Sequence, residues 1–188
     1  MANISNDPII AAGFAITDNW NRRVELGSGR IVRVNQAAHK WILTGNFVPK
    51  NHLNGGWNRS VDLFTNEDIQ IPMPQPTAHV LHADQGNLAL SSAEVMRGTQ
   101  VSVSGTITSH LTAGRFISIG TKVYLVRFVD IRDTNLFIYP GLVQDYNAGE
   151  TVNVRPEINL SKAPEYVNSL VVTSRGFSNE RVTLHERI

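Results

Sequence analysis

Apolar and polar residues alternate in short runs through the second half of the chain. The run TQVSVSGTIT at 99–108 is followed by RFISIGTKVYLVRFV at 115–129, which breaks at Gly120-Thr121. Alternation with a period of two is typical of half-buried β-strands, and a glycine at the break is typical of a tight turn. Further turn signals stand at 132–135 and 144–149, before LFIYP and TVNVRP. Closely spaced strands of this kind predict a sandwich or a small barrel.

The same pattern recurs in the first half of the chain and at its end. A hairpin is expected from Arg22 to Asn35, around Gly27-Ser28-Gly29. WILTGNFV at 41–48 predicts the next strand, and residues 61–71 predict one or two more. VNSLVVTS and RVTLHERI predict two closing strands, separated by a turn at 175–179.

A short helix is expected in one place. Residues Leu88 to Met96 are the best helical candidate, with Ser91 or Ser92 near the start and Gly98 after the end. The predicted fold class is therefore mainly β: antiparallel β-sandwich or small barrel modules with at most one or two short helices.

Three prolines in the segment IPMPQP at 71–76 mark a boundary between two modules, because proline cannot donate to a strand ladder. Before the first module, Asn3, Asn6, Asp7 and Pro8 disfavour a helix and predict an extended arm. The expected division is an N-terminal arm at 1–20, a first β module at 21–76, a connector at 77–98 and a second β module at 99–188.

Composition limits the function classes. The 188 residues include no cysteine, which removes disulfides and thiolate chemistry. The formal net charge is +1 without a long basic run, so specific nucleic-acid binding is not expected. Charged residues make up only 18% of the chain, and a weakly charged surface suits either solvent or burial against partner chains. No signal peptide or membrane-spanning stretch is expected.

Candidate chemistry is sparse. The sequence has no phosphate-binding glycine loop and no G-x-S-x-G nucleophile motif. His79 and His82 form H-x-x-H but are interpreted as surface or interface histidines. The carboxylate pairs Glu67-Asp68 and Asp130/Asp133 lie at expected turns, where aspartate commonly caps the backbone. The chain is therefore expected not to be an enzyme, and to need no cofactor and no metal.

All three tryptophans lie in the first third of the chain, and large aromatic side chains dominate both cores and interface hot spots. Trp41 stands in an alternating strand and is expected in the core. Trp57 follows Gly55-Gly56 in a loop and is the best candidate for a contact with another chain. A carbohydrate-binding platform would use such a tryptophan too.

Three runs follow one another in the second half: GTQVSVSG, then LTAGRFISIGTKVYLV at 111–126, then LFIYPGL at 136–142. This succession resembles small β modules of tail and baseplate proteins of tailed bacteriophages. Residues 99–156 are covered well and 20–49 loosely, through a strand of the form W-x-x-x-x-x-x-x-P. Those proteins often have a longer helical stretch after the first module, whereas residues 50–76 here are rich in turns.

The resemblance implies a virion structural protein of the distal-tail, hub or adaptor type, made in the host cytoplasm. Such proteins form symmetric rings, usually sixfold, so the expected partners are further copies of the chain and other phage tail proteins. The N-terminal arm, the loop at 50–60 and the C-terminal strand would carry the contacts. The candidate interface residues are Ile9, Ile10, Phe14, Trp57, Phe177 and Ile188. The alternative is a carbohydrate- or receptor-binding β module on the same particle.

Overall fold

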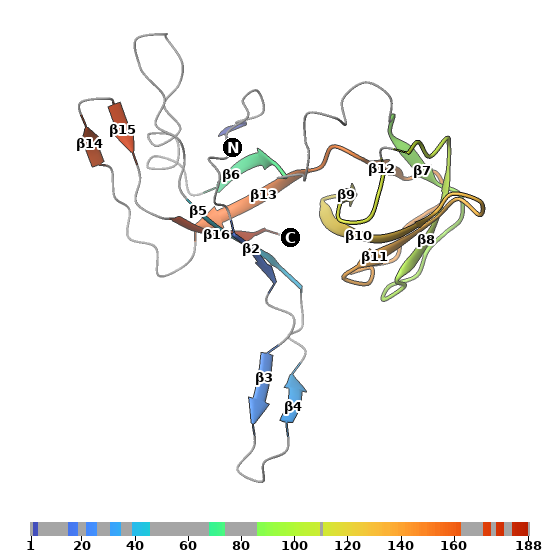
Figure 1. Cartoon of the computed structure of the whole chain (residues 1–188), viewed down its shortest axis with the longest axis horizontal. Coiled ribbons are helices and arrows are strands. Elements are labelled where there is room, and N and C mark those ends of the chain that lie inside the picture. Colours follow the sequence, from blue (N-terminus) through green and yellow to red (C-terminus); the bar gives the residue numbers. More distant parts are fainter. Residues whose placement is uncertain are drawn as a thin grey trace. The chain divides into compact units, whose positions relative to one another are not determined.

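The computed structural model describes residues 2–3, 15–18, 22–25, 31–34, 39–45, 68–73, 86–109, 111–162, 171–173, 176–178 and 182–187. Every regular element in these residues is a β-strand (Figure 1), which confirms the mainly β prediction. Contacts between residues group the chain into two units. Unit 1 comprises Met1–Ile71 with Asn159–Ile188, and unit 2 comprises Pro72–Ile158.

Unit 1 contains a six-stranded sheet with the order β1-β6-β13-β16-β5-β2. β1 pairs with β6 in parallel, whereas β13–β16, β16–β5 and β5–β2 are antiparallel pairs. The strands of this sheet are β1 (Ala2–Asn3), β2 (Ala15–Asp18), β5 (Trp41–Gly45), β6 (Asp68–Pro72), β13 (Glu157–Lys162) and β16 (Val182–Glu186).

Two hairpins form two-stranded sheets of their own, separate from the six-stranded sheet. They are β3 (Arg22–Glu25) with β4 (Ile31–Val34), and β14 (Val171–Thr173) with β15 (Gly176–Ser178). The first agrees with the hairpin expected at 22–35. The second corrects an expectation, because Gly176–Ser178 was expected in a turn and instead forms a strand against Val171–Thr173.

The core of unit 1 is built by alternating apolar residues. Trp41 is 4% exposed, which confirms its predicted place in the core, and Leu43 two residues further on is fully buried. His39 is also buried and its ring meets Trp41 edge-on, with 4.7 Å between the ring centroids. The buried Glu186 carboxylate accepts a hydrogen bond from the Trp41 backbone N–H at 3.0 Å, which joins β16 to the start of β5.

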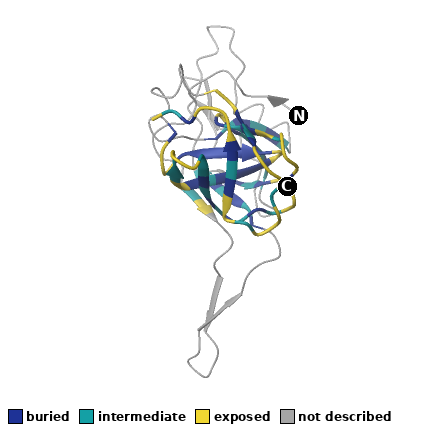
Figure 2. Ribbon diagram, turned by 90° about the vertical axis from the view of Figure 1, so that its right-hand side faces the viewer, coloured by how far each residue is buried: buried dark blue, intermediate teal, exposed yellow. Residues whose placement is uncertain are grey.

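Unit 2 is a closed six-stranded barrel with the order β10-β11-β8-β7-β12-β9, so the small-barrel form of the prediction is the correct one. All its strand pairs are antiparallel. Figure 2, which faces this unit, shows buried residues alternating with more exposed ones along its strands. The strands are β7 (Leu88–Leu90), β8 (Gln100–Ser104), β9 (Phe116–Ile119), β10 (Lys122–Asp130), β11 (Asn135–Tyr139) and β12 (Thr151–Asn153).

The expected turn at Gly120-Thr121 is confirmed, because Ile119 pairs with Lys122 across it. Gly120 has a φ of +59°, a left-handed conformation that glycine adopts without steric cost at the first position of a two-residue hairpin loop.

The expected helix at Leu88–Met96 is wrong. Leu88–Leu90 is strand β7, with both leucines buried and Ala89 half-buried between them. The residues that follow bond to distant backbone rather than to their own preceding turn: Glu94 forms a bridge with Tyr146, and the Arg97 N–H donates to the carbonyl of Leu142. Tertiary pairing therefore overrides the local helical signal.

The observed units also divide the chain differently from the expected modules. The first crossing, between Ile71 and Pro72, lies at the proline-rich segment where a boundary was expected. The chain then returns to unit 1 between Ile158 and Asn159, so residues 159–188 belong with the N-terminal unit. The segment expected as a connector, 77–98, contributes strand β7 to the barrel.

Candidate functional site

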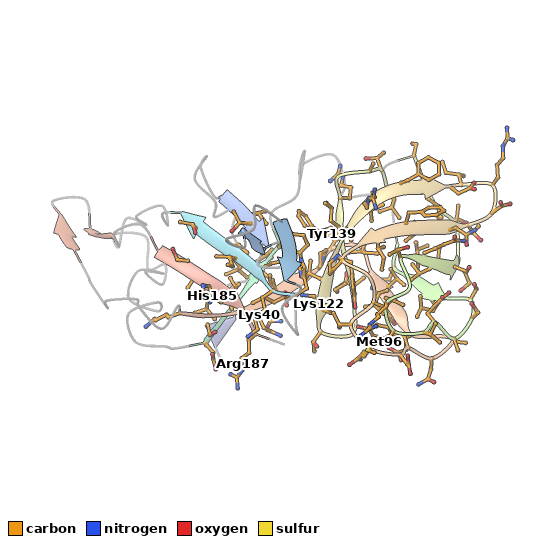
Figure 3. The ribbon with its side chains drawn as sticks, turned by 90° about the horizontal axis from the view of Figure 1, so that it is seen from below. Lys40, Met96, Lys122, Tyr139, His185 and Arg187 are labelled. Atoms are coloured by element: carbon orange, nitrogen blue, oxygen red, sulfur yellow. The ribbon has the colours of Figure 1, made fainter. Side chains whose placement is uncertain are left out.

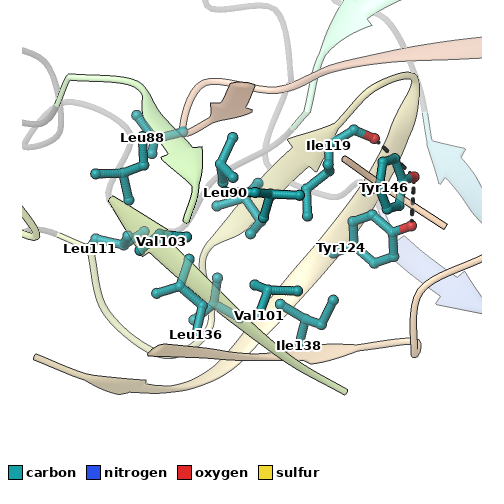
Figure 4. Packing of buried hydrophobic residues seen from close by; sticks show 14 of the residues in the cluster. Leu88, Leu90, Val101, Val103, Leu111, Ile119, Tyr124, Leu136, Ile138 and Tyr146 are labelled. Carbon is teal, nitrogen blue, oxygen red and sulfur yellow. Dashed lines mark hydrogen bonds between the residues drawn. The ribbon is translucent and has the colours of Figure 1, made fainter. Parts of the chain in front are cut away.

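The interior of the barrel is filled by apolar side chains. These side chains pack against one another in one continuous cluster (Figure 4). Small barrels of this type are packed cores rather than ligand chambers. The buried cluster is Leu88, Leu90, Val101, Val103, Ile107, Leu111, Ile117, Ile119, Tyr124, Val126, Leu136, Ile138, Leu142, Tyr146, Val152 and Val154.

Two tyrosine hydroxyls inside this core form a hydrogen bond with each other. The Tyr124 and Tyr146 oxygens are 3.0 Å apart, and the Tyr146 hydroxyl donates to the Ile119 carbonyl at 3.2 Å (Figure 4). The Val143 backbone N–H donates to the Tyr124 oxygen at 3.3 Å. Since Tyr146 donates onward, Tyr124 donates to Tyr146, and the chain of hydrogen bonds runs in one direction. This arrangement ties the segment 142–146 to β9 and β10.

The outer surface of the barrel carries an aromatic hollow, formed by Thr99, Arg127, Phe128 and Phe137. Its volume is about 230 Å³. Phe128 is 57% exposed, and its ring centroid lies 5.6 Å from that of Phe137 with 53° between the ring planes. A single positive side chain, Arg127, therefore lies beside two partly exposed aromatic rings.

A β-bulge in β10 creates this hollow. The pairing of β10 with β11 shifts register between Val126 and Phe128. Val126 is fully buried, Arg127 and Phe128 are both exposed, and Val129 packs against the core again. Without the extra residue, alternation would turn the Phe128 side chain inward, because a one-residue shift moves every side chain to the other face.

A second exposed apolar surface lies on the segment that follows β7. Val95 is 70% exposed and Met96 is 49% exposed. The Met96 backbone N–H donates to an Asp145 carboxylate oxygen at 2.6 Å, which brings a negative charge to this surface. We call Val95, Met96 and Asp145 the 95–96 surface. Met96 is labelled in Figure 3.

Arg115 and Lys122 of unit 2 are 5% and 1% exposed, and burial lowers the pKa of Arg115 from its ordinary value. Within the residues that the structure describes, no three or more His, Asp or Glu side chains are grouped to hold a metal ion. Those residues also include no helix long and apolar enough to cross a membrane.

The carboxylates singled out in the sequence have structural contacts. Asp130 Oδ1 accepts hydrogen bonds from the backbone N–H groups of Arg132 and Asp133, as the turn-capping interpretation expects. Asp68 forms an ion pair with Arg187 in unit 1. Glu67, His79 and His82 lie outside the described residues.

Most of the interface residues expected from the sequence cannot be placed. Phe177 lies in strand β15, opposite Val172 in the register of the hairpin. The others lie outside the described residues: Ile9, Ile10, Phe14, Trp57 and Ile188. The exposed residues that the structure does reveal, Phe128 and Met96, were not predicted. The alternation of β10 could not identify Phe128 as exposed, because the bulge reverses the alternation just before it.

No protein-family model matches the chain, and no curated protein matches its sequence.

Proposed function

We propose that the chain is a virion structural protein of the tail or baseplate of a tailed bacteriophage, which forms a symmetric ring and joins neighbouring tail components. The sequence resemblance that suggests this role covers residues 99–156, which form strands β8 to β12 of the barrel. The function would depend on shape and on contacts between chains rather than on chemistry.

The observation that carries the proposal is the contrast between the two sides of the barrel wall. Inside, apolar side chains form one buried cluster, as expected for a barrel with few strands. Outside, Val95, Met96 and Phe128 are large apolar residues that are about half exposed or more. Exposed aromatic and methionine side chains are enriched where proteins bind one another.

Unit 1 offers a second kind of support. Among the described strands its sheet is open, with β1 at one end and β2 at the other. The hairpins β3–β4 and β14–β15 pair only within themselves in the described topology. An isolated two-stranded hairpin is only marginally stable in water, and an open sheet end can accept a strand from another chain. Both features suit a subunit whose hairpins pack on its neighbours.

Electron microscopy of the purified full-length chain tests the proposal. We expect closed rings of uniform diameter, and we expect antibodies against the chain to label the tail or baseplate of intact particles. Dispersed single subunits, together with labelling of the capsid or of no particle at all, would contradict it.

The aromatic hollow also favours the alternative function, a carbohydrate- or receptor-binding module on the same particle. Sugar rings stack on aromatic faces, and Arg127 and Thr99 could supply hydrogen bonds beside Phe128. Chemical-shift changes confined to the hollow residues on adding host-surface oligosaccharides, at millimolar or lower dissociation constants, would favour this alternative. Their absence would favour the assembly role.

A further inference from the structure

The aromatic hollow and the 95–96 surface have different side chains: aromatic rings beside a cation on the first, and aliphatic side chains beside a carboxylate on the second. The hollow is concave and combines two aromatic rings with the cationic Arg127. The 95–96 surface presents two exposed aliphatic side chains, of Val95 and Met96, beside the carboxylate of Asp145. Methionine packs readily against aromatic rings, because its thioether is polarizable and its side chain is flexible.

Other charged side chains lie near the two surfaces. Arg97 is exposed beside Met96, and Glu94 is half-buried, where its carboxylate accepts hydrogen bonds from the Ser102 backbone and the Ser92 hydroxyl. Near the hollow, Asp130 is engaged in capping its own turn. The 95–96 surface therefore has one negative neighbour, Asp145, which is hydrogen-bonded to the Met96 backbone, and one positive neighbour, Arg97.

The placement of the two surfaces determines what kind of assembly they could form. Met96 lies three residues before Thr99 of the hollow, whereas Phe128 and Phe137 of the hollow belong to β10 and β11. Two different, complementary patches on one subunit produce head-to-tail contacts. Such contacts close into a ring when the rotation between subunits permits it, whereas a twofold dimer would need one self-complementary patch.

We propose that the aromatic hollow of one copy of this chain receives Val95 and Met96 of the next copy, with Arg127 facing Asp145 across the contact. This inference rests on the proposed ring-forming function and identifies the surfaces that would build the ring. Phe128 is the central contact, because a half-exposed aromatic residue in a hollow gains most from being covered.

Site-specific disulfide formation tests the contact directly, because the chain has no cysteine of its own. Two full-length variants, Met96→Cys and Phe128→Cys, are prepared separately. The Met96 change keeps the backbone N–H that bonds to Asp145. Each variant alone, and then an equimolar mixture, is exposed to a mild oxidant and analysed by non-reducing electrophoresis. Circular dichroism establishes that both variants are folded.

We expect a covalent dimer in the mixture, with one chain of each variant, and little or none with either variant alone. A dimer from Phe128→Cys alone would mean that two hollows face each other, which overturns the head-to-tail contact. No covalent dimer in any sample, while the unmodified chain still forms rings, would overturn the choice of surfaces and leave the proposed function intact. A chain that forms no rings and no dimer would contradict both.

A matched pair of alanine variants provides an independent readout. Phe128 and Ile131 are both 57% exposed, but only Phe128 lines the hollow. Truncating a central aromatic residue of an interface weakens association by about tenfold or more. We therefore expect Phe128→Ala to raise the dissociation constant of the assembly at least that much, and Ile131→Ala, which lies outside both surfaces of the proposed contact, to leave it unchanged. Equal effects of the two variants would contradict the proposal.

Discussion

The hydrogen-bonded tyrosine pair inside the barrel yields a quantitative prediction. Tyr146→Phe removes two hydrogen bonds, to Tyr124 and to the Ile119 carbonyl. Tyr124→Phe also removes two, to Tyr146 and to the Val143 backbone N–H. With about 1 kcal/mol for each net hydrogen bond, each single change should lower the free energy of unfolding by about 2 kcal/mol.

The double variant distinguishes a connected chain of hydrogen bonds from two independent hydroxyls. The bond between the tyrosines is common to both single changes, so the double variant loses three bonds and should be destabilised by about 3 kcal/mol rather than about 4. The coupling between the two sites is therefore about 1 kcal/mol, which a double-mutant cycle resolves.

Urea unfolding followed by circular dichroism measures these free energies. All three tryptophans fall within residues 1–71, so tryptophan fluorescence reports unit 1 separately from the barrel. Strictly additive single changes would refute the hydrogen bond between Tyr124 and Tyr146. Single changes with no effect on stability would refute the whole chain of hydrogen bonds.

Two further predictions concern packing in unit 2. A Cβ atom on Gly141 would lie 2.8 Å from the Arg97 carbonyl oxygen, so Gly141→Ala should lower the free energy of unfolding by about 1–3 kcal/mol. At Gly86 nothing lies within 4 Å of an added Cβ atom, so Gly86→Ala should leave the free energy of unfolding unchanged in the same urea titration. A destabilised Gly86 variant would show that the comparison does not measure crowding. Leu136→Ala opens a cavity in the buried core and should lower the free energy of unfolding by about 2–5 kcal/mol. Ile131→Ala, at an exposed turn, should change the unfolding midpoint little. Equal losses of stability in the two variants would refute the assigned burial.

Local patterns predicted those parts of the fold in which neighbouring residues decide the structure. Val101 and Val103 alternate with polar residues and point into the barrel, and Gly120 stands at the tight turn that its conformational freedom suggests. Trp41 is buried in the strand that its surroundings predicted.

The features that escaped sequence analysis depend on distant residues. Leu88–Leu90 becomes a strand because β8 and β12 pair on either side of it, and no local signal identifies those partners. The return of β13 and β16 to the sheet of unit 1 is likewise a pairing of remote segments. The aromatic hollow depends on one extra residue at Arg127, and alternation alone places Phe128 on the wrong face of the strand.

The native mass of the purified full-length chain, measured over a wide range of concentrations, is the most direct test of whether this protein works by binding copies of itself. The proposed assembly predicts a discrete multiple of the 20.8 kDa subunit, and a shift to smaller species when Phe128 is replaced by alanine. The copy number of six is the one that the resemblance to tail proteins implies. A mass of one subunit at every concentration, unchanged by that substitution, would contradict the account.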